Sequence, residues 1–368
     1  LIREWLNLVS VSGTGPTVLV PSRNLKAPYS QQYSLAIERE LGNAYLVSLA
    51  YVGTRGIKLL RLTTPNLGLG SIIEVDTIEP LIPIDGGGFL PLLTGTTVSP
   101  GCPRETPLVE RICPDADQRP VPFLGGLSVF ESSAASTYHS LQLEVRRRYR
   151  RGWQLSAALT YSHAIDDVSD IFDTGSSFAL PQNSLNLAAE RASADFDQRV
   201  RLAISALWDL PFHERHWLLG GWKLAGIFIA SSGQPYTVNT AVDVNRDGHP
   251  TDRLNTTRGL IIAADGRTRL RLAPGVEPER LLAPAGQSGA IGRNTFRKAP
   301  VATLDLAVSK EFRITDRHRL LFRTEIFNLL NRTHWGTPVR ILEAPAFGQS
   351  VNTTIPARTI QIALKYSF

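Results

Sequence analysis

Residues 360–368 constrain this chain most, because they alternate strictly between apolar and polar or small side chains. The apolar positions are Ile360, Ile362, Leu364, Tyr366 and Phe368. A period of two places these residues on one face of a β-strand and the intervening ones on the other. An amphipathic strand with aromatic residues at its end is typical of membrane β-barrels, whose aromatic side chains form girdles at the bilayer interfaces.

The same alternation recurs in four earlier pairs of segments. The pairs are 33–41 with 45–51, 141–149 with 153–161, 200–210 with 222–231, and 304–312 with 320–326. A short turn separates the two members of most pairs, and Gly42-Asn43 is of the kind that closes hairpins. Together with the terminal segment and the end of a strand within residues 1–30, the pattern predicts about nine or ten strands.

Long segments that contain Gly and Pro separate one pair from the next. They cover about 53–137, 163–198, 233–300 and 331–356. Bacterial outer-membrane barrels have short periplasmic turns and longer extracellular loops, and strands of ~10 residues suit a tilted span. We therefore predict an all-β fold for residues 1–368, an antiparallel transmembrane β-barrel with tight periplasmic turns and long extracellular loops. A soluble extracellular β-domain, whose polar faces meet solvent, is the alternative.

Three cations interrupt the apolar faces of these segments. They are Arg39, Arg147 and Lys310, and all lie near the short turns. A long basic side chain close to a strand end can extend to lipid headgroups. We interpret these residues in that way and expect outer-membrane lipid to be a partner.

The composition argues against several other classes. No apolar run approaches the ~18–20 residues of a spanning helix. The net charge of +6 and the pI of about 9.5 could suit nucleic acid. However, the basic run 146–151 lies at a strand end and turn without a nucleic-acid-binding motif, so we expect no such partner. Without a catalytic triad or a phosphate loop, we also expect no enzyme and no organic cofactor.

Several motifs, in the same order, resemble the barrel of the Oar-like TonB-dependent outer-membrane receptors, the type that carries a carboxypeptidase-regulatory-like domain. They cover residues 31–35, 50–56, 138–143, 159–167, 194–199, 221–226, 232–236 and 325–332. The resemblance implies a larger barrel of ~22 strands around a plug. We therefore expect this chain to be its C-terminal portion, because an open sheet of nine or ten strands would leave unpaired edges in lipid.

The parts expected upstream are a signal peptide, the carboxypeptidase-regulatory-like domain, a TonB-contacting segment, the plug and the first half of the barrel. The absence of Met, and of a secretory signal at Leu1, fits this expectation. The resemblance implies a receptor in the cell outer membrane of a Gram-negative-type bacterium that binds an unknown bulky extracellular ligand and imports it with TonB. An outer-membrane structural or adhesion barrel without transport is the alternative.

The terminal strand also resembles the signal by which the barrel-assembly machinery recognises outer-membrane proteins. The residues that would carry this signal are Ile362, Leu364, Tyr366 and Phe368. We therefore expect them to matter for membrane insertion more than for ligand binding.

Asp243, Asn245 and Asp247 have the D-x-N-x-D-G spacing of calcium loops, in which alternate side chains present oxygens to the ion. The twelfth position is Leu254 rather than Glu, which excludes an EF-hand, although Asp252 could supply a carboxylate instead. An Asp/Asn/Gly turn in an outer loop is the favoured interpretation, and a Ca²⁺ site is the alternative.

Two other sets of polar residues allow weaker inferences. Cys102 and Cys113 match no zinc pattern, and they would form a loop disulfide in an oxidising compartment or remain two thiols. Asp166, Asp167, Asp170 and Asp173 follow a predicted strand, and we interpret them as part of a solvated loop.

Overall fold

Nine long strands form the main sheet of the protein. The computed structural model describes residues 18–67, 72–84, 88–98, 127–171, 180–212, 218, 220–245, 247, 249, 251–263 and 265–368, with the backbone alone for 72–84 and 88–98. The nine strands are β2 (Tyr29–Leu41), β3 (Tyr45–Thr63), β6 (Leu127–Arg150), β7 (Trp153–Asp166), β9 (Val200–Asp209), β10 (Trp222–Ser231), β15 (Val301–Arg313), β16 (Arg319–Phe327) and β17 (Thr359–Ser367).

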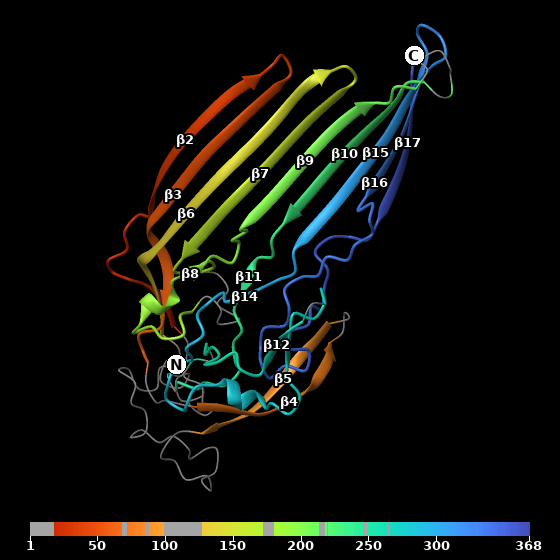
Figure 1. Cartoon of the computed structure of the whole chain (residues 1–368). Coiled ribbons are helices and arrows are strands. Elements are labelled where there is room, and N and C mark those ends of the chain that lie inside the picture. Colours follow the sequence, from red (N-terminus) through yellow and green to blue (C-terminus); the bar gives the residue numbers. More distant parts are fainter. Residues whose placement is uncertain are drawn as a thin grey trace, which may run out of the picture.

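Each of these strands is antiparallel to the next one along the chain (Figure 1), so the sheet is a simple meander. Two short strands extend it: β1 (Val18–Pro21) runs parallel to β6, and β8 (Ala192–Ser193) is antiparallel to β7. The predicted all-β, antiparallel architecture is confirmed.

The sheet does not close on itself within the described residues. There β2 pairs only with β3, and β17 pairs only with β16. Each edge strand therefore has one side whose backbone N–H and C=O groups have no neighbouring strand, which is the feature that a closed barrel removes.

The two ends of the meander are built differently. Short connections, among them Gly42–Ala44 and Arg151–Gly152, lie at the same end as the C-terminus (Figure 1). Arg151 and Gly152 have φ angles of 54° and 81°, as a two-residue type I′ hairpin requires. The segments after β3, β7, β10 and β16 gather at the other end, as the sequence pattern predicted.

Several strands extend further than the sequence pattern indicated. β3 continues to Thr63 and β6 already begins at Leu127, so the loop predicted at 53–137 starts too early and ends too late. The registers of β3 and β6 shift between Gly56 and Leu59 and again before Arg61, and these irregularities hide the period of two. Within that loop, β4 (Ile72–Ile84) and β5 (Gly88–Val98) form a further hairpin.

The registers align the apolar residues of neighbouring strands on one face of the sheet. One row consists of Ile37, Leu49, Leu143, Leu159 and Leu202. Another consists of Ile362, Val308, Leu224 and Trp208, with Thr324 between the first two. Many large apolar side chains of this face are exposed, as expected for a lipid-facing surface. Polar and small residues predominate on the opposite face, where Ile227 and Ile229 are exceptions.

Aromatic rings cover two of the three cations on the apolar face. The Arg147 guanidinium lies 3.5 Å from the Trp153 ring centroid, and Lys310 Nζ lies 4.8 Å from that of Phe312. Both cations are buried, so the prediction that they extend to headgroups is wrong for them. The face of an aromatic ring attracts a nearby cation. Each of these two side chains therefore finds a favourable partner within the protein and does not need to extend to a lipid headgroup.

A compact core lies among the outer segments rather than in the sheet. It consists of Tyr236, Val238, Leu254, Leu270, Leu281, Phe296 and Leu342. The elements around it are β11 (Pro235–Tyr236), β12 (Leu260–Ile262), β13 (Leu270–Leu272), β14 (Phe296–Arg297) and the 3₁₀ helix η3 (Pro278–Leu281), and another such helix, η2 (Leu187–Glu190), follows β7. Across the described residues, no helix has the length and hydrophobicity to cross a bilayer.

Candidate functional site

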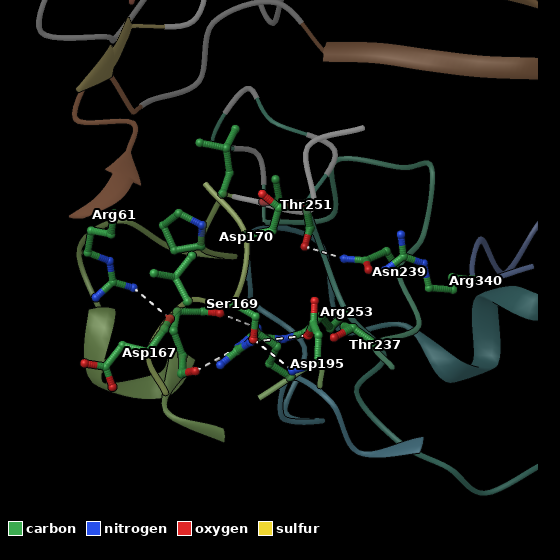
Figure 2. Close-up of a pocket in the computed structure, with 15 residues that line it drawn as sticks. Arg61, Asp167, Ser169, Asp170, Asp195, Thr237, Asn239, Thr251, Arg253 and Arg340 are labelled. Carbon is green, nitrogen blue, oxygen red and sulfur yellow. Dashed lines mark hydrogen bonds and ion pairs between the residues drawn. The ribbon is translucent and has the colours of Figure 1, made fainter. Parts of the chain in front are cut away.

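Segments from four parts of the chain meet at the loop end of the sheet and enclose a charged cavity (Figure 2). Arg61 comes from the end of β3, and Glu190 from η2 in the segment after β7. Arg253 comes from the segment between β10 and β15, and Arg340 from the one between β16 and β17. The strand ends thus bring together residues that are distant in sequence.

The most buried ion pair of the site joins Arg253 to Glu190. Arg253 Nη1 lies 2.7 Å from Glu190 Oε2, and the two side chains are only 5% and 3% exposed. The other carboxylate oxygen, Oε1, accepts a hydrogen bond of 3.1 Å from the backbone N–H of Gln182. Two outer segments are therefore fastened to each other by a charge pair from which water is excluded.

Arg293 is a second connection between the same segments. Its Nε donates to the carbonyl of Glu190 at 3.0 Å, and its Nη1 donates to Ser169 Oγ at 3.0 Å. Its Nη2 donates to the carbonyl of Asp166 at 2.8 Å and also pairs with the Asp166 carboxylate. Asp166 is buried in this arrangement, so its interpretation as part of a solvated loop is wrong. The countercharge of Arg293 offsets the burial of the carboxylate.

Asp197 connects the end of β7 to arginines of the outer segments. It is fully buried, and its Oδ1 accepts a hydrogen bond of 2.8 Å from the Ala164 N–H at the end of β7. Its Oδ2 accepts from Arg199 Nε at 3.0 Å and from Arg297 Nη2 at 2.6 Å. One carboxylate therefore joins the end of β7 to two loop arginines.

Several polar atoms of the cavity lining have no hydrogen-bond partner among the described residues. They are Arg61 Nε, Arg253 Nε, Asn239 Oδ1 and Thr251 Oγ1. The cavity has a volume of about 40 Å³, which is room for a few water molecules and too little for a bulky ligand. Water or a small polar group can satisfy these atoms.

A larger cavity of about 400 Å³ shares Asp195 and Arg340 with the first. It is also lined by Tyr236 and Lys298, together with residues 337–341. Burial lowers the pKa of Lys298, and it raises the pKa of Tyr236 to about 12. The volume lies within the range of small-molecule sites, and the lining combines an aromatic ring with basic groups.

The candidate calcium residues lie in the outer segment between β10 and β15. Asp243 Oδ1 and Asn245 Oδ1 both accept hydrogen bonds from the Asp247 N–H, at 3.1 and 3.0 Å. Leu254, at the twelfth position of the motif, is fully buried in the loop core, which agrees with the exclusion of an EF-hand.

Of the other residues singled out from the sequence, Asp167 and Asp170 line the first cavity, and Asp173 lies outside the described residues. The residues of the terminal strand lie away from both cavities. Ile362, Leu364, Tyr366 and Phe368 are all exposed on the apolar side of β17 and just after it, as the alternation predicted. Cys102 and Cys113 lie outside the described residues, so their pairing stays a prediction.

Sequence reasoning did not single out Arg253, Arg293 or Glu190, although these residues form the charged site. Each lies in a long segment without periodicity. The one available signal was the motif at 194–199, which contains Asp197 and leads into β9.

Comparisons with known proteins give one family match. Residues 6–361 match the family described as "Outer membrane beta barrel domain". A search of curated proteins found no match.

Among solved structures, similar chains include the outer membrane transporter YddB from Escherichia coli, with 9% identity and a TM-score of 0.46 over 96% of this chain and 34% of that one. The copper transporter OprC matches with 9% identity and a TM-score of 0.39 over 94% and 32%. The ferripyoverdine receptor of Pseudomonas aeruginosa matches with 12% identity and a TM-score of 0.42 over 94% and 28%. This chain therefore spans about a third of the length of these proteins.

Proposed function

Because this chain belongs to the outer membrane beta barrel domain family and is located in the cell outer membrane, we propose that it is part of a receptor that captures an extracellular ligand for TonB-dependent uptake. The observation that carries this proposal is the difference between the two ends of the sheet. Tight turns occupy one end, while four outer segments at the other enclose adjoining cavities.

The open sheet supports a longer receptor. Within the described residues, β2 and β17 each have an unpaired side, and a bilayer does not tolerate exposed backbone groups. We infer that further strands complete the barrel. In our proposal they come from the same polypeptide, of which this chain is the C-terminal portion of an Oar-like receptor, together with a plug and a TonB-contacting segment.

The outer segments are suited to holding a ligand in a fixed geometry. Arg253, Arg293 and Asp197 connect them through buried ion pairs and hydrogen bonds, so the cavity walls are fixed before a ligand arrives. Preorganised walls reduce the conformational entropy that binding would otherwise cost. The cavity of about 400 Å³, with Lys298 and Arg340 in its lining, is the site we assign to part of the ligand.

The test of TonB dependence is a binding measurement on the full-length receptor in detergent. We expect the periplasmic domain of TonB to bind it and not to bind a variant that lacks the TonB-contacting segment. An intact full-length protein that does not bind TonB would contradict energised uptake and would favour a structural or adhesion barrel.

A further inference from the structure

The loop end of the apolar face carries exposed cations. The registers pair Gln31 of β2 with Arg55 of β3, and Arg55 with Thr137 of β6, so these three residues continue the apolar face toward the loops. Arg55 and Lys58 are exposed, and within the described residues neither has an ion pair. Lys58 Nζ lies 5.6 Å from the ring centroid of Tyr29, which is on the same face. The loop end of this face is therefore basic.

Arg191 adds a third cation to the same area. Its Nη2 donates to Thr137 Oγ1 at 3.2 Å, so its guanidinium lies beside the residue opposite Arg55. Its Nη1 also lies 3.1 Å from Asp167 Oδ1. The Arg191 side chain is 42% exposed, whereas that of Asp167 is only 15% exposed. The positive member of this ion pair therefore faces outward, and the negative member is largely covered.

The spacing along β3 places the cations at a boundary of the bilayer. Arg55 follows Tyr45, at the turn end of β3, by ten residues, and both lie on the apolar face. At ~3.3 Å per residue and a strand tilt of ~40°, this spacing corresponds to ~25 Å along the membrane normal. The apolar band of outer-membrane barrels is ~25 Å tall. Tyr45 and Arg55 therefore lie at opposite interfaces of the bilayer.

Three aromatic rings support the same placement. Tyr33 and Tyr51 have ring centroids 6.2 Å apart, and Tyr51 Oη lies 2.8 Å from His139 Nδ1. All three side chains are exposed on the apolar face, slightly closer to the turn end than Arg55. Aromatic residues of membrane barrels gather at the interfaces, where the hydrocarbon meets the headgroups. The cations just beyond these rings are thus at the level of the headgroups.

We propose that the loop end of the apolar face binds the phosphate groups of anionic lipid headgroups through Arg55, Lys58 and Arg191. A guanidinium can donate two parallel hydrogen bonds to a phosphate, and an ammonium group contributes a compact positive charge. In the proposed orientation these headgroups belong to the outer leaflet of the outer membrane. This interaction goes beyond the proposed function, since it requires neither ligand capture nor TonB.

A lipid fits this surface better than a soluble acidic partner does. The cations border an area of exposed apolar side chains, among them Leu35, Leu49 and Leu141. A lipid covers both parts at once, because its chains lie against the leucines while its phosphate meets the cations. A soluble partner would have to displace the lipid from the apolar part to reach the same cations.

The test is a measurement of lipid binding to the full-length protein in a non-ionic detergent. The probes are dioctanoyl phosphatidic acid, whose phosphate is a monoester, and dioctanoyl phosphatidylcholine, whose choline group neutralises the phosphate. Native mass spectrometry or thermophoresis gives the two dissociation constants. Phosphatidic acid should bind about tenfold more tightly or better. High salt should reduce this preference, because exposed charges are screened.

The double variant Arg55→Gln/Lys58→Gln should reduce the preference for phosphatidic acid by roughly tenfold. The matched control is Arg258→Gln/Arg280→Gln, which removes the same charge from exposed positions of an outer segment. The control should keep the preference of the wild type.

Three results would overturn the proposal. They are equal binding of the two lipids to the wild type, an unchanged preference in Arg55→Gln/Lys58→Gln, and binding of inorganic phosphate as tight as that of phosphatidic acid. The last result would indicate an anion site that does not recognise lipid. If the double variant does not fold, the first and third measurements decide, because both use the wild type.

Discussion

Arg253 and Glu190, which are far apart in sequence, form a buried ion pair of 2.7 Å at the loop end of the sheet. Both side chains are almost completely buried, so each depends on the other for its countercharge. The pair connects the segment after β7 to the segment after β10, and the cavity lies against both. The arrangement of the outer segments therefore depends on this ion pair, whose two residues are brought close together by the neighbouring strands.

Replacing one member of this pair should destabilise the outer segments strongly. Glu190→Gln keeps an acceptor for the Gln182 N–H but leaves the Arg253 charge buried and unpaired, which we expect to cost about 3 kcal/mol. The measurement is the free energy of unfolding, or the rate of loop proteolysis, in the detergent-solubilised protein. The matched control is Glu311→Gln, whose partner Arg319 lies 3.4 Å away in a half-exposed pair. Its cost should stay below about 1 kcal/mol, and equal costs would contradict this account.

Tyr33 should determine which residues are tolerated at position 53. The Tyr33 ring on β2 lies over Gly53 on β3, where an added Cβ would meet Cε2 at 2.1 Å. Gly53→Ala should therefore displace the ring from Tyr51 and His139 and destabilise the β2–β3 edge by about 1 kcal/mol. The fraction of heat-modifiable, folded protein on a gel reports this loss.

The control for Gly53 is Gly226→Ala on β10, where the nearest atoms lie 3.7 Å from the added Cβ. That variant should assemble normally. A Tyr33→Ala background should abolish the effect of Gly53→Ala. A loss that persists without the ring would rule out the steric explanation.

Tyr236 should make the loop core sensitive to alkaline pH. Its hydroxyl is buried without a hydrogen-bond partner among the described residues, and burial raises its pKa from 10.0 to about 12. The folded state thus favours the protonated form. This contribution to stability is complete below pH 10, and it is lost as the pH rises toward about 12.

Tyr236→Phe is the variant that checks this dependence. This variant should lack the part of the loss in stability between pH 10 and 12 that Tyr236 causes. At neutral pH it should be as stable as the wild type or more stable, because it has no unsatisfied hydroxyl at this position. Unfolding free energies of the two proteins across this pH range provide the comparison. Parallel curves would show that folding does not shift the pKa of Tyr236, and would contradict this account.

The aromatic end of β17 should control the amount of protein in the outer membrane. Tyr366 and Phe368 stack with ring centroids 5.8 Å apart, and Tyr366 also stacks on His318 of the adjacent turn. Phe368→Ala in the full-length protein should lower its outer-membrane level, measured by fractionation and quantitative blotting. Ser367→Ala, on the opposite face, should not. Equal levels in both variants would refute a role for Phe368 in assembly.

The strands could be predicted from the sequence because their information is local. Ile360 to Phe368 and the earlier segments alternate residue by residue, and a period of two suffices to place each side chain on a face. The outer ends of β3 and β6 were missed because register shifts near Gly56 and Leu59 break that period.

The charged site could not be predicted because its contacts are not local. Arg293 pairs with Asp166, which is 127 residues earlier in the chain, and no periodicity relates the two positions. Leu254, Leu281 and Leu342 form a core inside the loops for the same reason. Such contacts depend on which strand ends lie side by side, and this follows only from the assembled sheet.

The most direct test of the account is the accessibility of single cysteines in intact cells that express the full-length protein. With Cys102 and Cys113 replaced by Ser, Glu277→Cys reports on an exposed outer segment and Asp316→Cys on an exposed tight turn. A membrane-impermeant maleimide should label position 277 in intact cells, and it should label position 316 only after the outer membrane is permeabilised. Labelling of position 316 in intact cells, with position 277 protected, would contradict the proposed orientation and with it the capture of a ligand by these segments.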